Sequence, residues 1–231
     1  DVSREHLPPF VKTVSLRAKS ADKTVRYVLC NNKETLLWLA NFGCIEMNPW
    51  LSRTGHIQKP DYLVIDLDPH GRSFDDVVKV AQTVRTVLEK IHKKSWPKTS
   101  GKTGMHIAVP LLPAQAGGAR FSYSEARIFA KALVARVHEL LPSLTTLEQR
   151  LNKRHGKIYL DVMRNAYGQT AAAPYSLRPY PGATVSTPLR WSEVKKGLRP
   201  SQFTIKTIFP RLKKKGNVLK SIVIRKAWGS Q

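Results

Sequence analysis

The chain has 231 residues, of which 42% are hydrophobic and 8% aromatic, so it can bury a substantial core and is not a disordered tail. Its net charge of +23 favours a polyanionic partner, nucleic acid above all, over a membrane surface. No apolar run approaches the roughly 20 residues of a membrane span. No signal peptide is visible, and two cysteines, Cys30 and Cys44, cannot build a disulfide framework, which indicates a reducing cytoplasm.

The first 50 residues predict a hairpin followed by a helix. Residues 11–17 and 24–30 are strand-like runs joined by a short polar link, which favours an antiparallel pair. Residues 33–42 carry apolar side chains at helical spacing, with Trp38 expected in the core, and Gly43 is a typical helix end. Residues 44–47 then predict a short strand.

Residues 61–69 predict a buried strand that ends in two carboxylates. The run from Tyr62 to Ile65 is apolar, which is typical of a strand covered on both faces. Because side chains alternate along a strand, Asp66 and Asp68 point to the same side, and two anions held so close require a proton or a metal cation. Hard oxygen ligands on a rigid strand end suit Mg²⁺ or Mn²⁺.

Other interpretations of this Asp-x-Asp sequence remain open. The carboxylates could cap the following helix or hold a turn. Haloacid-dehalogenase-type phosphatases carry Asp-x-Asp after a strand, but usually with Thr or Val two residues further on, where this chain has His70. Some glycosyltransferases use the same sequence, although nothing else in the chain indicates a sugar-nucleotide enzyme.

Helices and strands follow one another along the rest of the chain. Ser73 can cap a helix over residues 73–92, which is followed by a glycine-rich turn and an apolar strand at 105–109. The remaining predicted elements are a loop at 110–118, a helix at 124–141, a polar helix at 146–155, a strand at 158–162, an ordered loop containing a strand at 169–188, short helices at 192–196 and 203–212, and a tail at 218–227 that is ambiguous between helix and strand.

The turn at residues 99–106 combines two glycines with hydroxyl side chains and a lysine. It is not a P-loop, because Trp96 stands where that motif needs a glycine and the turn precedes a strand. Its backbone N–H groups can still surround phosphate oxygens. His106 is either a structural histidine or, beside Ser100 and Lys102, a polyphosphate contact.

Asp161 is a third acid, embedded in the apolar strand at 158–162. An unpaired buried carboxylate is costly, so Asp161 requires a cation or hydrogen bonds. Arg164 could supply an ion pair. Alternatively, Asp161 joins Asp66 and Asp68, because three carboxylates from two strands suit a site for two metal ions.

Five sequence features occur here in the order seen in the archaeo-eukaryotic primase superfamily. They are GCIEMNPW at residues 43–50, DLDP at 66–69, SGxxGxH at 100–106, Asp161, and APYSxR at 173–178. The chain most resembles the polymerase domain of bacterial ligase D, a family that repairs DNA double-strand breaks by non-homologous end joining. The resemblance extends from about Leu7 to Trp191.

The resemblance implies an α+β fold, in which two small mixed or antiparallel sheets flanked by helices form a cleft around an RRM-like catalytic core. One primase-polymerase domain is expected over residues 1–231, with its catalytic core at about 7–191 and a basic helical segment at about 192–231. The implied catalytic residues, which are also the implied ligands of two Mg²⁺ or Mn²⁺ ions, are Asp66, Asp68 and Asp161.

The resemblance also implies a nucleotide-binding set. Asn48 matches a position, often His in the family, near the nucleotide sugar. The family often has Lys or Arg at the position of Thr103, so either Lys102 replaces that contact or the contact is lost. The complete nucleotide-binding set expected is Asn48, Ser100, Lys102, Thr103, His106 and Arg178.

The function implied is a template-directed nucleotidyltransferase that adds nucleotides, preferably ribonucleotides, to primer 3′ ends at DNA breaks or gaps with a 5′-phosphate. Ku and a DNA ligase domain are expected as partners, at the nucleoid of a prokaryotic cytoplasm and without a membrane. Basic residues near the N-terminus are candidate DNA contacts, although they could equally be ordinary surface charge: Lys12, Arg17, Lys19, Lys23 and Arg26.

Two alternative functions remain. The first is a primase that starts chains without a primer, although the chain has no cysteine cluster for the zinc module that many primases use. The second is a non-catalytic module that binds DNA ends. This second alternative leaves three acids on strands unexplained, because unneutralised carboxylates repel DNA phosphates.

Overall fold

The computed structural model describes residues 7–17, 23–111 and 120–218. The chain divides into two compact units, residues 1–45 and 46–231, and each is described by itself. The expectation of one domain over the whole chain stays a prediction. Within the ranges just given, no helix is both long and apolar enough to cross a membrane.

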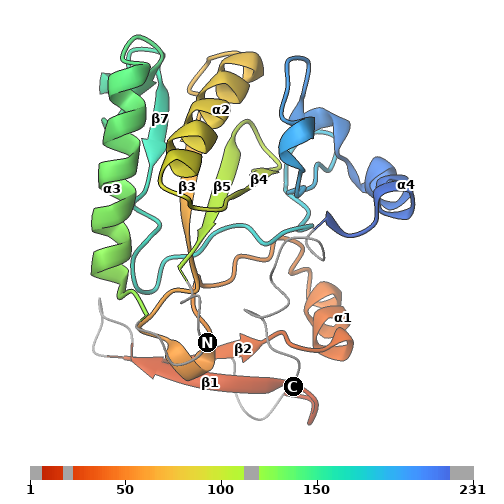
Figure 1. Ribbon diagram of the computed structural model, residues 1–231. Helices are drawn as coiled ribbons and strands as arrows, with labels where there is room; N and C mark the ends of the chain where they lie inside the picture. Colours follow the sequence, from red (N-terminus) through yellow and green to blue (C-terminus); the bar gives the residue numbers. More distant parts are fainter. Residues whose placement is uncertain (1–6, 18–22, 112–119, 219–231) are drawn as a thin grey trace. The chain divides into compact units, whose positions relative to one another are not determined.

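The first unit contains a two-stranded antiparallel sheet, as the sequence predicts (Figure 1). Strand β1 (Lys12–Arg17) pairs with β2 (Thr24–Leu29), and Lys12 lies opposite Leu29. Because opposite residues share a face, Arg17 and Arg26 lie on one face of the hairpin and Lys12 on the other.

Helix α1 (Lys33–Asn41) follows the hairpin and confirms the second prediction for this region. It begins at Asn32, whose side-chain oxygen accepts a hydrogen bond of 2.7 Å from the backbone N–H of Thr35. The buried face is not the expected apolar one. Thr35 is buried, whereas Leu36 is 46% exposed and Trp38 is half-buried.

The second unit is built around a five-stranded sheet (Figure 1). The pairs β4–β5, β5–β3 and β3–β7 are antiparallel, and β6 runs parallel to β7. From one edge to the other, the strands are β4 (Trp96–Thr99), β5 (Met105–Pro110), β3 (Tyr62–Asp68), β7 (Ile158–Asp161) and β6 (Thr145–Thr146).

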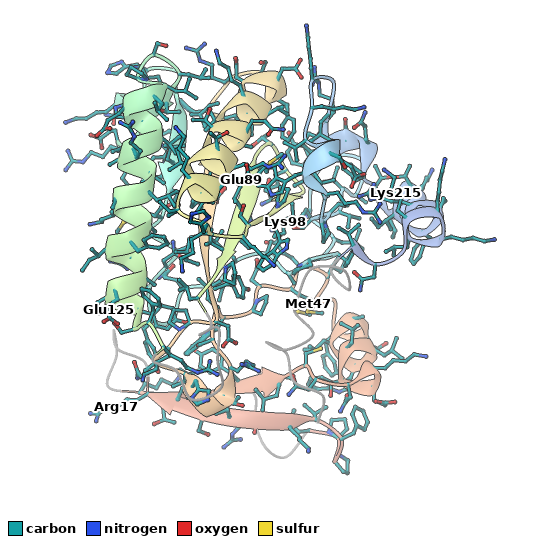
Figure 2. The ribbon with its side chains drawn as sticks, viewed as in Figure 1. Arg17, Met47, Glu89, Lys98, Glu125 and Lys215 are labelled. Carbon is teal, nitrogen blue, oxygen red and sulfur yellow. The ribbon has the colours of Figure 1, made fainter. Side chains whose placement is uncertain are left out.

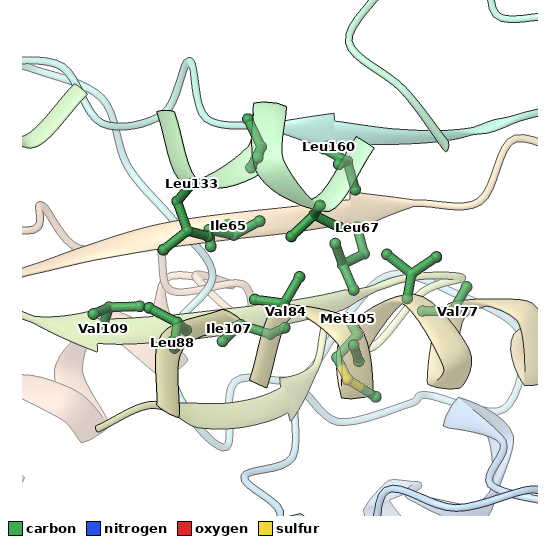
Figure 3. Packing of buried hydrophobic residues seen from close by; sticks show 14 of the residues in the cluster. Ile65, Leu67, Val77, Val84, Leu88, Met105, Ile107, Val109, Leu133 and Leu160 are labelled. Carbon is green, nitrogen blue, oxygen red and sulfur yellow. The ribbon is translucent and has the colours of Figure 1, made fainter. Parts of the chain in front are cut away.

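Two long helices, α2 (Phe74–Lys90) and α3 (Tyr123–Leu140), pack on one face of this sheet (Figure 3). Leu63, Ile65 and Leu67 of β3 point into that core and are fully buried. Burial of each contributes about 1.5–3 kcal/mol. Because side chains alternate, the residues between them on β3 point to the opposite face of the sheet, and a register slip of one residue would exchange the two sets.

Serine caps begin both long helices, close to the predicted positions. The side chain of Ser73 accepts a hydrogen bond from the backbone N–H of Asp76 at 3.2 Å. Ser122 and Glu125 form a capping box at the start of α3. These caps satisfy backbone donors that an uncapped helix end would leave without partners.

The strand predicted at residues 44–47 is wrong. The backbone N–H of Met47 donates to the Ser176 hydroxyl at 2.8 Å, and the Met47 carbonyl accepts from the N–H of Ala173 at 2.9 Å. The backbone groups of Met47 therefore form hydrogen bonds with an irregular loop rather than with a strand.

The helix predicted at residues 146–155 is also wrong. Thr145–Thr146 forms β6 beside β7, and only Leu151–Lys153 makes a short 3₁₀ turn, η3. The backbone N–H of Ile158 donates to the carbonyl of Leu144 at 2.9 Å, which draws this segment onto the sheet.

The loop at residues 169–188 contains isolated bridges but no strand, contrary to expectation. Its end runs along β4, where the backbone N–H of Thr99 donates to Thr187 and that of Leu189 donates to Pro97. Residues 112–118 of the predicted loop and 219–227 of the predicted tail lie outside the described residues. The remaining elements are η2 (Thr54–His56), η4 (Trp191–Glu193), η5 (Pro200–Gln202) and α4 (Ile205–Lys215).

Candidate active site

Four side chains form one row across the sheet, on the face opposite α2 and α3. Lys98 of β4 lies opposite His106 of β5, His106 lies opposite Asp66 of β3, and Asp66 lies opposite Asp161 of β7. Asp68 is two residues further along β3 on the same face, opposite Tyr159. The backbone therefore brings the three predicted acids to neighbouring positions, with a histidine and a lysine in line with them.

Asp66 is a carboxylate whose pKa the fold raises. Burial raises its pKa to about 6, Arg164 opposes that rise, and the charges of Asp161 and Asp68 add to it. Arg164 Nε lies 3.2 Å from Oδ2, and His106 Nε2 lies 3.5 Å from Oδ1. Arg164 thus pairs with Asp66 rather than with Asp161, its expected partner in the ion-pair alternative.

The other two acids have their own partners. Arg154 Nη1 lies 2.6 Å from Asp68 Oδ2, and its guanidinium stacks over the Tyr159 ring at 4.3 Å from the ring centre. Asp161 Oδ1 accepts hydrogen bonds from the Met163 backbone N–H at 2.7 Å and from the Tyr159 hydroxyl at 3.4 Å.

The three carboxylates suit a divalent cation, both in their chemistry and in their positions on the backbone. Carboxylate oxygens are the ligands that Mg²⁺ and Mn²⁺ prefer, and Asp66, Asp68 and Asp161 supply them from two adjacent strands. In this side-chain arrangement, however, the described residues contain no group of three His, Cys, Asp or Glu side chains that could hold an ion. Cations of the chain itself, Arg164 and Arg154, instead contact two of the three acids.

His106 is buried and neutral at ordinary pH. Burial lowers its pKa well below the usual value, and the charges of Lys98, Arg164 and Arg178 lower it further. Its Nδ1 atom is buried without a hydrogen-bond partner among the described residues. A buried ring nitrogen in that state can bind a ligand atom that the structure does not contain.

The glycine-rich turn is held by Ser100. Its hydroxyl oxygen accepts from the backbone N–H groups of Lys102 at 3.2 Å and Gly104 at 3.1 Å, so these two donors already have a partner. Gly101 has φ of +78°, and a side chain there would overlap Arg178. The turn therefore packs closely against Arg178, whereas the predicted phosphate contacts of Ser100, Lys102 and the exposed Thr103 stay predictions.

Arg178 and Asn48 share one carboxylate that the sequence did not single out. Glu46 Oε1 lies 3.1 Å from Arg178 Nη2 and accepts from Asn48 Nδ2 at 3.2 Å. Two predicted nucleotide-binding residues from distant parts of the sequence are therefore brought together. The Nε atom of Arg178 is buried without a partner among the residues described.

Lys98 is a second residue that the sequence analysis missed. Its Nζ atom donates to the Ser186 hydroxyl at 2.5 Å. Burial lowers the pKa of Lys98 to about 7, the Asp66 charge opposes this, and the Arg178 and Arg164 charges add to it. Alternation within a strand at 96–99 could have found it, but a four-residue run containing Pro97 gives little strand signal.

The predicted DNA contacts belong to the first unit. Arg17 and Arg26 share a hairpin face, Lys12 lies on the other, and Lys23 comes just before β2. Lys19 lies outside the described residues. Their role in DNA binding stays a prediction.

Comparisons with known proteins agree on one family. The family model described as "LigD, primase-polymerase domain" matches residues 2–219. The chain is 35% identical over 214 residues to the bifunctional non-homologous end joining protein LigD of Bacillus subtilis (strain 168), a match covering 92% of this chain and 33% of that protein. It is 30% identical over 191 residues to the multifunctional LigD of Mycolicibacterium smegmatis, covering 81% of this chain and 24% of that protein.

A solved structure gives the same result for the fold. The polymerase domain from Mycobacterium tuberculosis ligase D in complex with DNA is similar with a TM-score of 0.80 and 27% identity, covering 95% of this chain and 76% of that chain. The predicted α+β class with two sheets is thereby confirmed. The chain spans a third or less of the length of the two LigD proteins above.

Proposed function

Because the chain belongs to the LigD primase-polymerase domain family, we propose that it is a template-directed nucleotidyltransferase acting in DNA end joining. It extends the 3′ end of a primer at a DNA break or gap with nucleotides, preferably ribonucleotides. The observation that carries this proposal is the pairing of Asp66 with Asp161 across two strands, with Asp68 beside them.

In the proposed reaction, the primer 3′-oxygen forms a bond to the α-phosphorus of the incoming nucleotide. The bond from that phosphorus to the bridging oxygen breaks, pyrophosphate leaves, and the hydroxyl proton passes to water. Asp66, Asp68 and Asp161 would hold two Mg²⁺ or Mn²⁺ ions. When bound, these ions would acidify the 3′-hydroxyl and stabilise charge on the leaving group.

Other residues of the chain bind and orient the nucleotide. Arg178 offers a buried Nε–H, and His106, whose Nε2 faces Asp66, offers a buried Nδ1; neither atom has a hydrogen-bond partner among the described residues. Cationic and N–H donors at fixed positions stabilise the charge that develops during phosphoryl transfer. Asn48, held by Glu46, is proposed to contact the sugar, where a 2′-hydroxyl offers both a donor and an acceptor.

The proposed substrates and partners follow from the relatives. The matched M. tuberculosis structure is a complex with DNA, and the matched full-length proteins act in non-homologous end joining. We therefore propose that this chain binds gapped or broken DNA with a 5′-phosphate, together with nucleoside triphosphates. Ku and a DNA ligase domain are proposed partners at the bacterial nucleoid.

Primer extension on gapped DNA with Mn²⁺ and ribonucleoside triphosphates tests this function. Asp66→Asn should lower the extension rate at least about 100-fold, because it removes one charged ligand and leaves the shape intact. Glu139→Gln is the matched control, since Glu139 is an exposed acid of α3 whose described partner is Arg136. Full activity of Asp66→Asn would overturn the mechanism.

The same assay separates the alternatives. Product formed on a single-stranded template without a primer would indicate a primase instead. DNA binding that is unaffected by divalent metal, together with no incorporation on any template, would indicate a non-catalytic module.

A further inference from the structure

Lys98 occupies one end of the row that contains the proposed metal ligands. The row runs Lys98, His106, Asp66, Asp161 across four neighbouring strands. Directly opposite residues on one sheet face have side chains close enough to interact. Figure 2 shows Lys98 within the body of the second unit, where β4 and β5 lie side by side.

The ammonium of Lys98 has no carboxylate partner within the described parts of the chain. Its one described hydrogen bond is to Ser186, a neutral hydroxyl that in turn donates to the Thr99 carbonyl at 3.0 Å. An ammonium has three N–H donors, and a cation removed from water is costly unless an anion pairs with it. A carboxylate pairs with each neighbouring guanidinium, Glu46 with Arg178 and Asp66 with Arg164.

Positive charge collects around His106 from three different segments. Lys98 comes from β4, Arg164 from the residues after β7, and Arg178 from the loop at 169–188, and all three act on the pKa of His106. Asp66 and Glu46 already pair with the two arginines, and the Asp66 charge also acts on Lys98, so among the described residues these three cations have two carboxylates as ion-pair partners. The position suits an anion that lies along the row and carries several charges of its own.

We propose that the Lys98 ammonium contacts the triphosphate of the incoming nucleotide, with Ser186 fixing its direction. The inference rests on the proposed function and adds a phosphate-binding residue to it. Lys102, the lysine expected from the sequence, lies on the turn two residues beyond Ser100. Among the described residues no side-chain hydrogen bond or ion pair orients Lys102, whereas Ser186 orients Lys98.

Calorimetric titration tests the inference with two probes, ATP and inorganic tripolyphosphate, each in the presence of Mg²⁺. Lys98→Met removes the charge at nearly constant volume, and Lys131→Met is the matched control, because Lys131 is an exposed lysine of α3. Loss of one charge-assisted hydrogen bond should weaken the binding of both probes by about ten- to a hundredfold in Lys98→Met. Lys131→Met should change either affinity by less than about threefold.

Two further variants distinguish loss of the Lys98 charge from loss of the folded structure. Lys98→Gln can still donate to Ser186 without carrying a charge, and it should lose affinity like Lys98→Met. Ser186→Ala keeps the charge and should lose less than either. Thermal unfolding should show that each variant is folded at the titration temperature.

The outcomes separate the inference from the proposed function. Lys98 variants that bind both probes as tightly as the wild type, or that lose affinity for ATP but not for tripolyphosphate, would overturn the phosphate contact. A wild-type protein that binds ATP through Lys98 but incorporates no nucleotide on gapped DNA would overturn the polymerase proposal and leave the contact standing.

Discussion

At the scale of single residues, Asp66 shows how the proposed site conflicts with stability. The fold removes this carboxylate from water and places it near two other acids, so its pKa rises to about 6 even with Arg164 beside it. At neutral pH the ionised form is therefore held in the fold at a cost in free energy. Groups that serve chemistry often destabilise the protein in this way.

Asp66→Asn should accordingly stabilise the metal-free protein at high pH. The pKa of Asp66 lies higher in the folded state than in the unfolded state, so this residue lowers the stability of the wild type as the pH rises from about 4 to 6. Above pH 6 the variant should be more stable by up to about 3 kcal/mol. Urea unfolding in the presence of a chelator, at pH 4 and pH 8, measures the difference.

Glu139→Gln again serves as the control, because its exposed carboxylate should give little difference at either pH. If Asp66→Asn were less stable than the wild type at pH 8, the ionised Asp66 carboxylate would not destabilise the folded state. A gain of equal size at pH 4 and pH 8 would equally contradict the explanation by ionisation.

The site residues that the sequence predicts and those that it does not predict differ in the local pattern around them. Asp66 and Asp68 follow from alternation along an apolar strand, and Asp161 interrupts another such strand. Glu46 and Lys98 do not, because Glu46 lies in an irregular segment and Lys98 follows Pro97 in a strand without an apolar run. The pairing of Arg164 with Asp66 depends on which strands become neighbours, which local pattern does not encode.

At the scale of elements, one buried side chain replaces a missing stretch of strand. Strand β7 ends at Asp161, so Val64 of β3 has no backbone partner on that side. Asn165 takes the place of one: its Oδ1 accepts from the Val64 N–H at 2.8 Å, and its Nδ2 donates to the Val64 carbonyl at 2.7 Å. A third bond, from Nδ2 to the Val162 carbonyl at 2.9 Å, fixes the turn that carries Arg164.

Asn165→Ala should therefore destabilise the protein by about 2–4 kcal/mol, because it leaves a buried N–H and two carbonyls with fewer partners. Chemical denaturation at pH 7 measures this loss. The matched control is Asn152→Ala, since Asn152 is exposed in η3 and should change stability by less than about 0.5 kcal/mol. Equal effects of the two substitutions would show that Asn165 does not act as a strand substitute.

Elements with a clear apolar pattern were predictable, and elements without one were not. The strands and helices that match the expectations have many apolar residues at one spacing, as in α2 and β3. The error at residues 146–155 arose because a polar stretch offers no apolar period, and β6 exists only through its pairing with β7. Likewise, residues 44–47 have strand-like composition, but their backbone groups bind the loop around Ser176.

At the scale of the whole molecule, the net charge of +23 predicts that binding to DNA depends on the salt concentration. Binding to duplex DNA should weaken by about 100-fold or more between 50 and 200 mM salt, because phosphate contacts release counterions. Fluorescence anisotropy with a gapped duplex, repeated over a salt series, measures this slope. Affinity that stays constant across the series would contradict an electrostatic mode of binding.

Hairpin variants refine the same measurement. Arg17→Ala and Arg26→Ala change one face of the hairpin, and Lys12→Ala changes the other. If one face binds phosphates, only its variants should make the salt slope shallower, by about one unit for each phosphate that the variant no longer neutralises. A slope unchanged in all three variants would remove the hairpin from the proposed DNA interface.

The row across the sheet has a direction, and this direction limits how a substrate can lie on it. Its acids occupy one end and its lysine the other, with neutral His106 between the lysine and Asp66. Three interstrand steps separate the ends, a span of roughly 14 Å. A nucleotide bound as proposed would place its reacting phosphorus toward β7 and the far end of its phosphate chain toward β4. A molecule bound in reverse would bring its most anionic group against the carboxylates, so under the proposed function the sheet would select one orientation before any chemistry begins.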